Sequence, residues 1–119
     1  MNDHSHVETV QRRLESARNA IHKLAPLVGM AKQVRDYDSD RRKNLLAKYM
    51  LPHLKAGGSA AASEVDARAD PAFQAEFDAL AGQRSASERT IAEWDAAFAT
   101  YEAARSLLSM AKETMRTLE

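Results

Sequence analysis

The chain contains no cysteine among its 119 residues. Disulfide frameworks, thiolate zinc sites, iron–sulfur clusters and cysteine nucleophiles are therefore excluded. Turn-forming residues are scarce, with 4 glycines and 3 prolines, too few for a protein of many short strands. Only 6% of the residues are aromatic although 45% are apolar, and much of the apolar share is alanine. This composition favours long, thin helices.

Long apolar runs and an excess of one charge are also absent. No stretch of the sequence approaches the roughly 18 consecutive apolar residues that a membrane-spanning helix needs. The first residues, MNDHSHVETVQRR, lack the basic-then-apolar order of a secretory signal, so we expect a cytoplasmic protein. The 17 basic and 17 acidic residues give a net charge of zero. That balance excludes a protein whose whole surface binds polyanions.

A first run of apolar residues begins at Val7 and recurs in steps of three and four as far as Ala31. This seven-residue repeat predicts a helix that packs along another helix. Pro26 lies inside the run, and an interior proline removes a hydrogen bond, so we expect a kink there. Acidic residues suited to helix capping follow at 36–40. A second helix could start there, although the pattern gives a continuous helix a modest advantage.

The clearest stop in the chain is Gly57-Gly58-Ser59. Residues 60–69 can form a short helix. Asp70 is then a capping residue, and Pro71 follows at the first helical position, where proline is favoured. We therefore expect a short helix to connect two long ones.

A second long run of apolar residues extends from Phe73 to Leu118, again in steps of three and four. Its spacing contains a gap between Leu80 and Ile91, where Arg84 and Ser87 occupy the apolar slots. A single helix of this length cannot bury its apolar residues in a core of its own. It must lie along the first helix, along a partner, or along both.

The predicted fold is all-α: an elongated, coiled-coil-like antiparallel hairpin that forms a single domain over residues 1–119. Its parts are a long kinked arm over 5–56, a turn at 57–59, a short helix over 60–69 and a long arm over 71–117. Residues 1–63 hold 11 basic and 6 acidic residues, and residues 64–119 hold 6 basic and 11 acidic residues. Opposite net charges favour pairing of the arms, although surface attraction is weak and screened by salt.

Two arms alone leave one flank of each apolar stripe exposed, which predicts a homo-oligomer. A dimer that forms a four-helix bundle is the simplest closure. Large aromatic residues concentrate on the second arm, opposite the small residues of the first, and this arrangement indicates core or interface packing instead of a ligand box. The expected interface residues are Phe73, Phe77, Trp94, Phe98 and Tyr101.

The sequence predicts no metal site, no cofactor and no catalytic residue. Asp36, Asp38 and Asp40 have the spacing that begins a calcium loop, but Arg41 and Ala47 occupy the positions where that loop needs Gly and Glu. We interpret the three acids as capping or solvated residues. The histidines at 22 and 53 lack a Glu or His at helical metal-site spacing, and the two near the N-terminus would make a poor metal site on their own. No nucleophile elbow, phosphate-binding glycine loop or dinucleotide fingerprint is present. We therefore expect a protein that is not an enzyme.

A basic stretch over residues 41–55 contains no acid. Clustered cations on a helix can bind phosphates, and an aromatic ring can stack on unpaired bases. The candidate nucleic-acid-binding residues are Arg41, Arg42, Lys43, Lys48 and Tyr49. We favour a solvated face, or a face that pairs with the acidic arm, as the explanation of these cations, because the charges are few and the chain is neutral overall.

Three segments follow one another along the chain in an order that supports a resemblance to a known group of proteins: YDSDRRKNLLAKYM, SEVDARADPAFQAEFDAL and YEAARSLLSMAKETMR. Over residues 35–117 this order resembles small helical proteins encoded by tailed bacteriophages and prophages. The resemblance implies an accessory role around phage DNA and transfers no mechanism to individual residues. We therefore expect a helical accessory or adaptor protein that acts through protein–protein contacts. The alternative is an accessory nucleic-acid-binding protein that uses the basic stretch.

Overall fold

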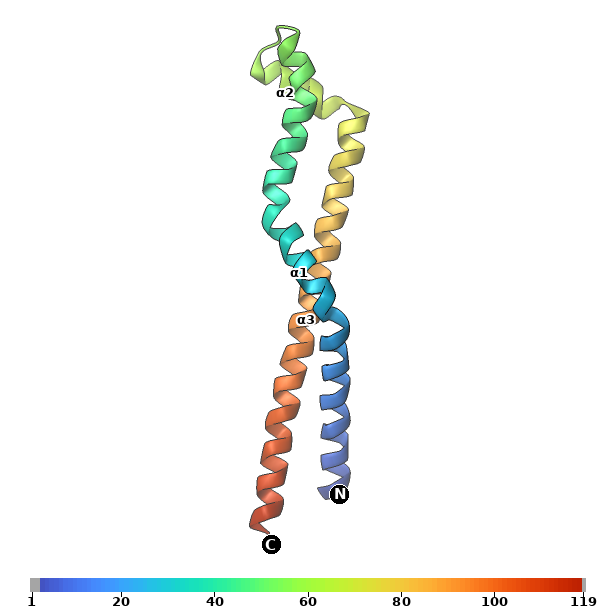
Figure 1. The fold of residues 1–119 in the computed structure, drawn as a ribbon, viewed down its shortest axis with the longest axis vertical. Helices are drawn as coiled ribbons and strands as arrows, with labels where there is room; N and C mark the ends of the chain where they lie inside the picture. Colours follow the sequence, from blue (N-terminus) through green and yellow to red (C-terminus); the bar gives the residue numbers. More distant parts are fainter. Residues whose placement is uncertain (1–2, 119) are drawn as a thin grey trace. The chain divides into compact units, whose positions relative to one another are not determined.

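The computed structural model describes residues 3–118, and it describes side chains from Ser5 onward. The described chain forms three helices and no strand (Figure 1). Helix α1 spans Asp3–Lys55, α2 spans Ala60–Ala69 and α3 spans Pro71–Thr117. The predicted all-α class is therefore confirmed.

Helix α1 is continuous over 53 residues. It passes through Pro26, which is exposed, and through the acidic residues at 36–40 without a break. The sequence favours one continuous helix over a second helix that starts at 36–40, and the structure confirms the continuous helix. Asp38 is 5% exposed, so the interpretation of this residue as a cap or a solvated acid is wrong.

The end of α1 is closed by two glycines in a Schellman arrangement. Gly57 has a φ of 95°, a conformation that costs an L-residue about 1–2 kcal/mol. Its N–H donates to the carbonyl of Leu54 at 3.1 Å, and the N–H of Gly58 donates to the carbonyl of His53 at 3.0 Å. A Cβ on Gly58 would lie 3.0 Å from that same carbonyl oxygen and 3.1 Å from Ser63 Oγ. The turn therefore favours glycine at both positions, at Gly57 for its φ and at Gly58 for the close approach of its neighbours.

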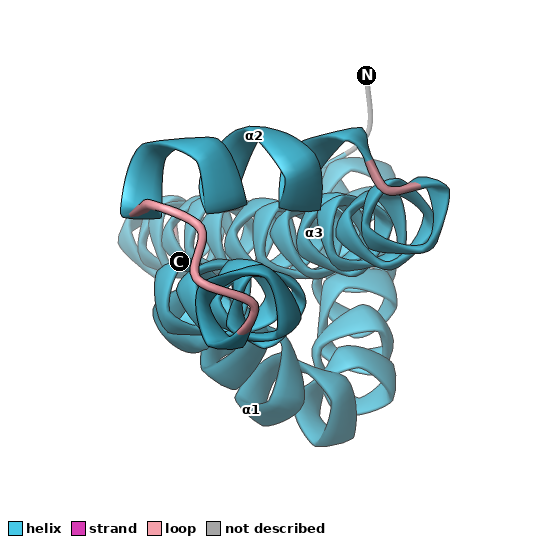
Figure 2. Ribbon diagram, turned by 90° about the horizontal axis from the view of Figure 1, so that it is seen from above, coloured by secondary structure: helices cyan, strands magenta, loops and turns pink. Residues whose placement is uncertain are grey.

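Side chains just before α2 and α3 cap both helices. The Ser59 hydroxyl accepts a hydrogen bond from the Ala62 N–H at 3.2 Å. The Asp70 carboxylate accepts one from the Ala72 N–H at 2.8 Å, and Pro71 is the first residue of α3. The predicted capping by Asp70 is confirmed. Helix α2 lies across the ends of its neighbours, joined to each by a short loop (Figure 2).

The chain divides into two compact units. The first combines the part of α1 up to Gly29 with the part of α3 from Arg89 onward, and the second comprises Met30–Glu88. In the second unit Tyr49 contacts Phe73, whereas Asp38, earlier in α1, contacts Arg84, later in α3. The two helices therefore run antiparallel in this unit, as predicted for the hairpin.

The first unit has the same antiparallel pairing. Residues 13–20 of α1 border a cavity with residues 96–100 of α3, whereas His6 and Val7 border one with residues 107–115. Both units have small cores. The buried apolar residues are Val10, Ala17, Val28 and Ala104 in the first unit and Ala31, Ala67 and Phe73 in the second. Large side chains along each apolar seam, meaning the line where α1 meets α3, are mostly half-buried.

Candidate interaction surfaces

Three side chains of the basic stretch contact α3 in the second unit. Arg41 Nη1 donates to Gln83 Oε1 at 3.3 Å. Lys48 Nζ lies 3.4 Å from Glu76 Oε1 and 5.4 Å from the centre of the Tyr49 ring. The Lys48–Glu76 pair joins the basic arm to the acidic arm, which is one of the alternatives that the sequence leaves open.

Tyr49 is the third of these side chains. Its ring packs edge-on against Phe73, with 5.7 Å between the ring centres, and its hydroxyl donates to Glu76 Oε2. This hydrogen bond, followed by burial and the charge of Glu76, raises the pKa of Tyr49 to about 12. The same bond, helped by Lys48, lowers the pKa of the Glu76 carboxyl group against the opposing effect of burial. The ring and the hydroxyl of Tyr49 are therefore both engaged in contacts with α3, and the side chain is half-buried.

The five candidate nucleic-acid-binding residues do not share one face of α1. Arg41 and Lys48 lie two helical turns apart on one side, where they border a cavity with Glu76. Arg42 and Lys43 border a different cavity, next to Phe73 and Phe77. Because residues one or two apart on a helix point in different directions, the stretch is continuous in sequence but divided in space.

The aromatic residues of α3 form two clusters, one in each unit. In the second unit Phe73 lies 5.6 Å from Phe77, between ring centres, and Phe73 is only 4% exposed. A single chain thus already covers Phe73, so this residue has little surface left for a partner. In the first unit Trp94 packs edge-on against Phe98 at 4.8 Å. Phe98 is 39% exposed, and Trp94 and Tyr101 are half-buried.

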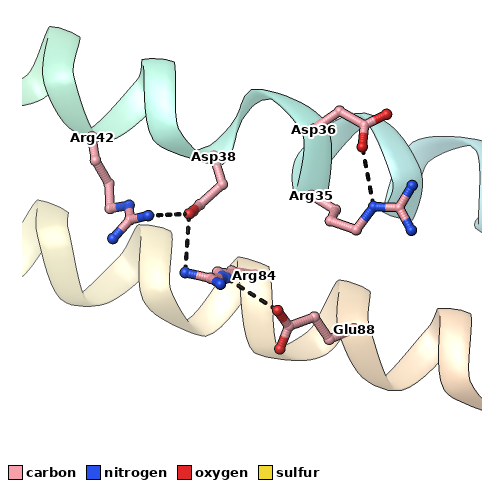
Figure 3. A network of polar contacts seen from close by, with 6 residues as sticks. All are labelled: Arg35, Asp36, Asp38, Arg42, Arg84 and Glu88. Carbon is pink, nitrogen blue, oxygen red and sulfur yellow. Dashed lines mark hydrogen bonds and ion pairs between the residues drawn. The ribbon is translucent and has the colours of Figure 1, made fainter.

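A polar layer, formed by the buried Asp38 together with Arg42 and Arg84, interrupts the apolar seam of the second unit (Figure 3). Asp38 Oδ2 lies 2.9 Å from Arg42 Nη2, one turn away on α1, and 3.4 Å from Arg84 Nη1 on α3. Arg84 Nε lies 3.1 Å from Glu88 Oε1. Two guanidinium groups thus compensate one carboxylate that is almost fully removed from water, as a buried charge requires.

One half of this layer is visible in the sequence, and the other half is not. Arg84 and Ser87 occupy slots of the second seam, and Ser87 is indeed buried. The sequence leads to the wrong interpretation of Asp38, although this residue follows the buried Ala31 by seven residues and so continues the first seam. The neighbouring Arg35–Asp36 pair, at 3.1 Å, is exposed and contributes little.

Two kinds of feature are absent from the described residues. Over residues 3–118, no helix is both long and apolar enough to cross a membrane. Within the part of the chain that the structure describes, no three Asp, Glu or His side chains gather closely enough to hold a metal ion.

No protein-family model, curated protein or solved structure matches the chain.

Proposed function

We propose that this chain is a non-enzymatic interaction protein that acts through protein–protein contacts, as an accessory or adaptor protein of a tailed phage or prophage. The phage setting rests on the sequence resemblance alone. The interaction role rests on the structure of the two units. Among the described residues, each unit buries only three or four apolar side chains, most of them Ala or Val, so neither has a large core of its own.

The observation that supports the proposal most directly is an apolar groove in the first unit, between the beginning of α1 and the end of α3. Its volume is about 240 Å³, and Val7, Leu107, Met110 and Met115 line it. Met110 is 66% exposed and Leu107 is 39% exposed. Single exposed apolar residues are ordinary, but apolar residues gathered along a groove mark a contact surface.

The partner that we favour is a second copy of the chain, with a dimer as the simplest assembly. An interface between identical chains uses the same patch on both, so one groove supplies both halves of the contact. Two antiparallel helix pairs that meet along their open flanks form a four-helix bundle. Phe98, in the same unit, is a further large apolar side chain of α3 that is partly exposed.

Analytical ultracentrifugation of the wild type and two variants tests the proposal. At micromolar concentration we expect the wild type to have a molecular mass of twice 13.2 kDa. Met110→Glu places a charge in the groove and should shift the mass towards the monomer, because a charge buried without a partner is costly. Ser109→Glu adds the same charge at a neighbouring exposed residue outside the groove and should leave the dimer intact. A wild-type mass of 13.2 kDa at all concentrations would contradict the dimer.

A further inference from the structure

A second cavity, in the second unit, differs from the others in its charge. Its volume is about 300 Å³, and it lies where α1, α2 and α3 meet. Three cationic side chains line it, Arg42 and Lys43 from α1 and Arg68 from the last turn of α2, and no carboxylate of the described residues joins them in the lining. The other two cavities described in this unit also carry cations, but each includes at least one carboxylate in its lining.

Carboxylates outside the lining neutralise only part of this charge. Arg42 shares Asp38 with Arg84, and the Nε of Arg42 is buried with no acceptor in the described part of the chain. Arg68 directs its Nε and one Nη towards a single oxygen of Glu64, both at 3.1 Å. Lys43 is exposed. The cavity therefore has an excess of positive charge and hydrogen-bond donors.

The rest of the lining is apolar and aromatic. Phe73 and Phe77 of α3 form one wall, and Leu46 of α1 lies beside them. On α1, Arg42, Lys43 and Leu46 lie three, four and seven residues after Ser39, so all four side chains can border the same cavity. Helix α2 brings Arg68 to the same cavity, although Arg68 lies 25 residues after Lys43 in the sequence. The cavity thus combines a cationic side with an aromatic wall.

We propose that this cavity binds a phosphomonoester carried on an apolar or aromatic group. A phosphomonoester has about 1.5 to 2 negative charges at neutral pH and several acceptor oxygens, which suits a site with three cations. Guanidinium groups bind such oxygens through directed, charge-assisted hydrogen bonds. The apolar part of the ligand would lie against Phe73 and Phe77. The volume lies at the lower end of the range for small-ligand sites.

Titration of the ¹⁵N-labelled wild type by NMR, with three probes, tests this binding. Phenyl phosphate carries both parts of the ligand, inorganic phosphate only the anion, and benzyl alcohol only the ring. We expect phenyl phosphate to cause saturable shifts of amides near Lys43, Arg68 and Phe73, and the other two probes to bind at least several-fold more weakly. Equal binding of inorganic phosphate would overturn the proposal, because the aromatic wall would then contribute nothing. Absence of saturable shifts with millimolar phenyl phosphate would overturn it too.

Matched variants separate this cavity from general attraction to the basic arm. Lys43→Ala and Arg68→Ala each remove one charge from the lining, and each should weaken phenyl phosphate binding by roughly tenfold. Lys32→Ala removes the same charge from an exposed position of α1 outside the cavity and should leave the affinity within about twofold of the wild type. Equal weakening by all three variants would overturn the proposal. These measurements are independent of the oligomeric state, so they stand or fall separately from the proposed dimer.

Discussion

At the scale of single residues, Tyr49 shows how one side chain holds two helices together. Its ring packs on Phe73 and its hydroxyl donates to Glu76, both on α3. The hydrogen bond favours the ionised form of Glu76, which is why the pKa of that carboxyl group falls below its usual 4.5. A carboxyl pKa that is lower in the folded state makes stability depend on pH. The stabilisation is complete above the unfolded pKa and is lost as the pH falls through the folded pKa.

Tyr49→Phe should therefore destabilise the chain more at neutral pH than in acid. The variant keeps the ring on Phe73 and removes only the donor, so its urea midpoint should lie below that of the wild type at pH 7. The difference should shrink in acid, as the pH falls through the lowered pKa of Glu76 and this carboxylate becomes protonated. Tyr37→Phe is the control, since the Tyr37 side chain is 56% exposed, and its midpoint should match the wild type. An equal loss at both pH values for Tyr49→Phe would show that the ionised carboxylate is not the acceptor.

Local residue patterns predict the caps but not the role of Tyr49. Capping by Asp70 depends on the next two residues, so the sequence alone contains the information. The hydroxyl of Tyr49 reaches a residue 27 positions away, and nothing in the neighbourhood of Tyr49 specifies that partner. In an exposed position the Tyr49 ring could stack on a base. This is why the sequence of the basic stretch predicts nucleic-acid binding as the alternative function.

At the scale of helices, the polar layer of Asp38, Arg42 and Arg84 restricts how α1 and α3 can pair. A slide of α3 by one heptad would place Phe77 or Ile91 opposite Asp38 in place of Arg84. The buried carboxylate would then lose its partner on α3, at a cost in free energy that the correct register avoids. The seams on either side are built from similar apolar residues and distinguish registers less well.

Asp38→Ala should lower the free energy of unfolding by about 1.5–3 kcal/mol, the usual range for charged hydrogen bonds. The loss arises because Arg42 and Arg84, which are partly buried, lose their shared acceptor. Asp40→Ala removes the same charge two residues away at an exposed position and should change stability by less than about 0.5 kcal/mol. Urea unfolding monitored by circular dichroism gives both values. Similar effects of the two substitutions would refute a structural role for the layer.

The helices themselves are predictable because their signals are periodic and local. Steps of three and four, the glycine pair at 57–58 and the Asp70-Pro71 start are all short-range patterns. The partners across the seam are not predictable, because the alignment of two long repeats is nearly degenerate until a specific pair such as Asp38 and Arg84 breaks it. The gap at Arg84 and Ser87 is visible in the sequence, but its counterpart on α1 is hidden among three alternating aspartates.

At the scale of the whole chain, opposite charges on the two arms cancel. Residues 1–63 have 11 basic and 6 acidic residues, and residues 64–119 reverse these numbers. A nucleic acid that approaches the basic stretch therefore meets carboxylates of α3, such as Glu76, which already pairs with Lys48. Nucleic-acid binding through residues 41–55 thus has to rely on cations that the chain's own contacts leave accessible. Arg41 and Lys43 are both exposed.

We expect nucleic-acid binding to be weak, independent of sequence and sensitive to salt. Labelled single- and double-stranded DNA should be titrated at about 50 and 200 mM salt, a range over which binding driven by phosphate neutralisation weakens strongly. If binding occurs, Arg41→Ala combined with Lys43→Ala should reduce the salt slope by about one for each phosphate that the variant no longer neutralises. Arg13→Ala combined with Lys23→Ala removes equal charge from exposed positions earlier in α1 and is the control. A wild type that binds neither DNA at low salt would exclude the basic stretch as a nucleic-acid surface, because the electrostatic attraction that supplies nonspecific affinity is strongest under that condition.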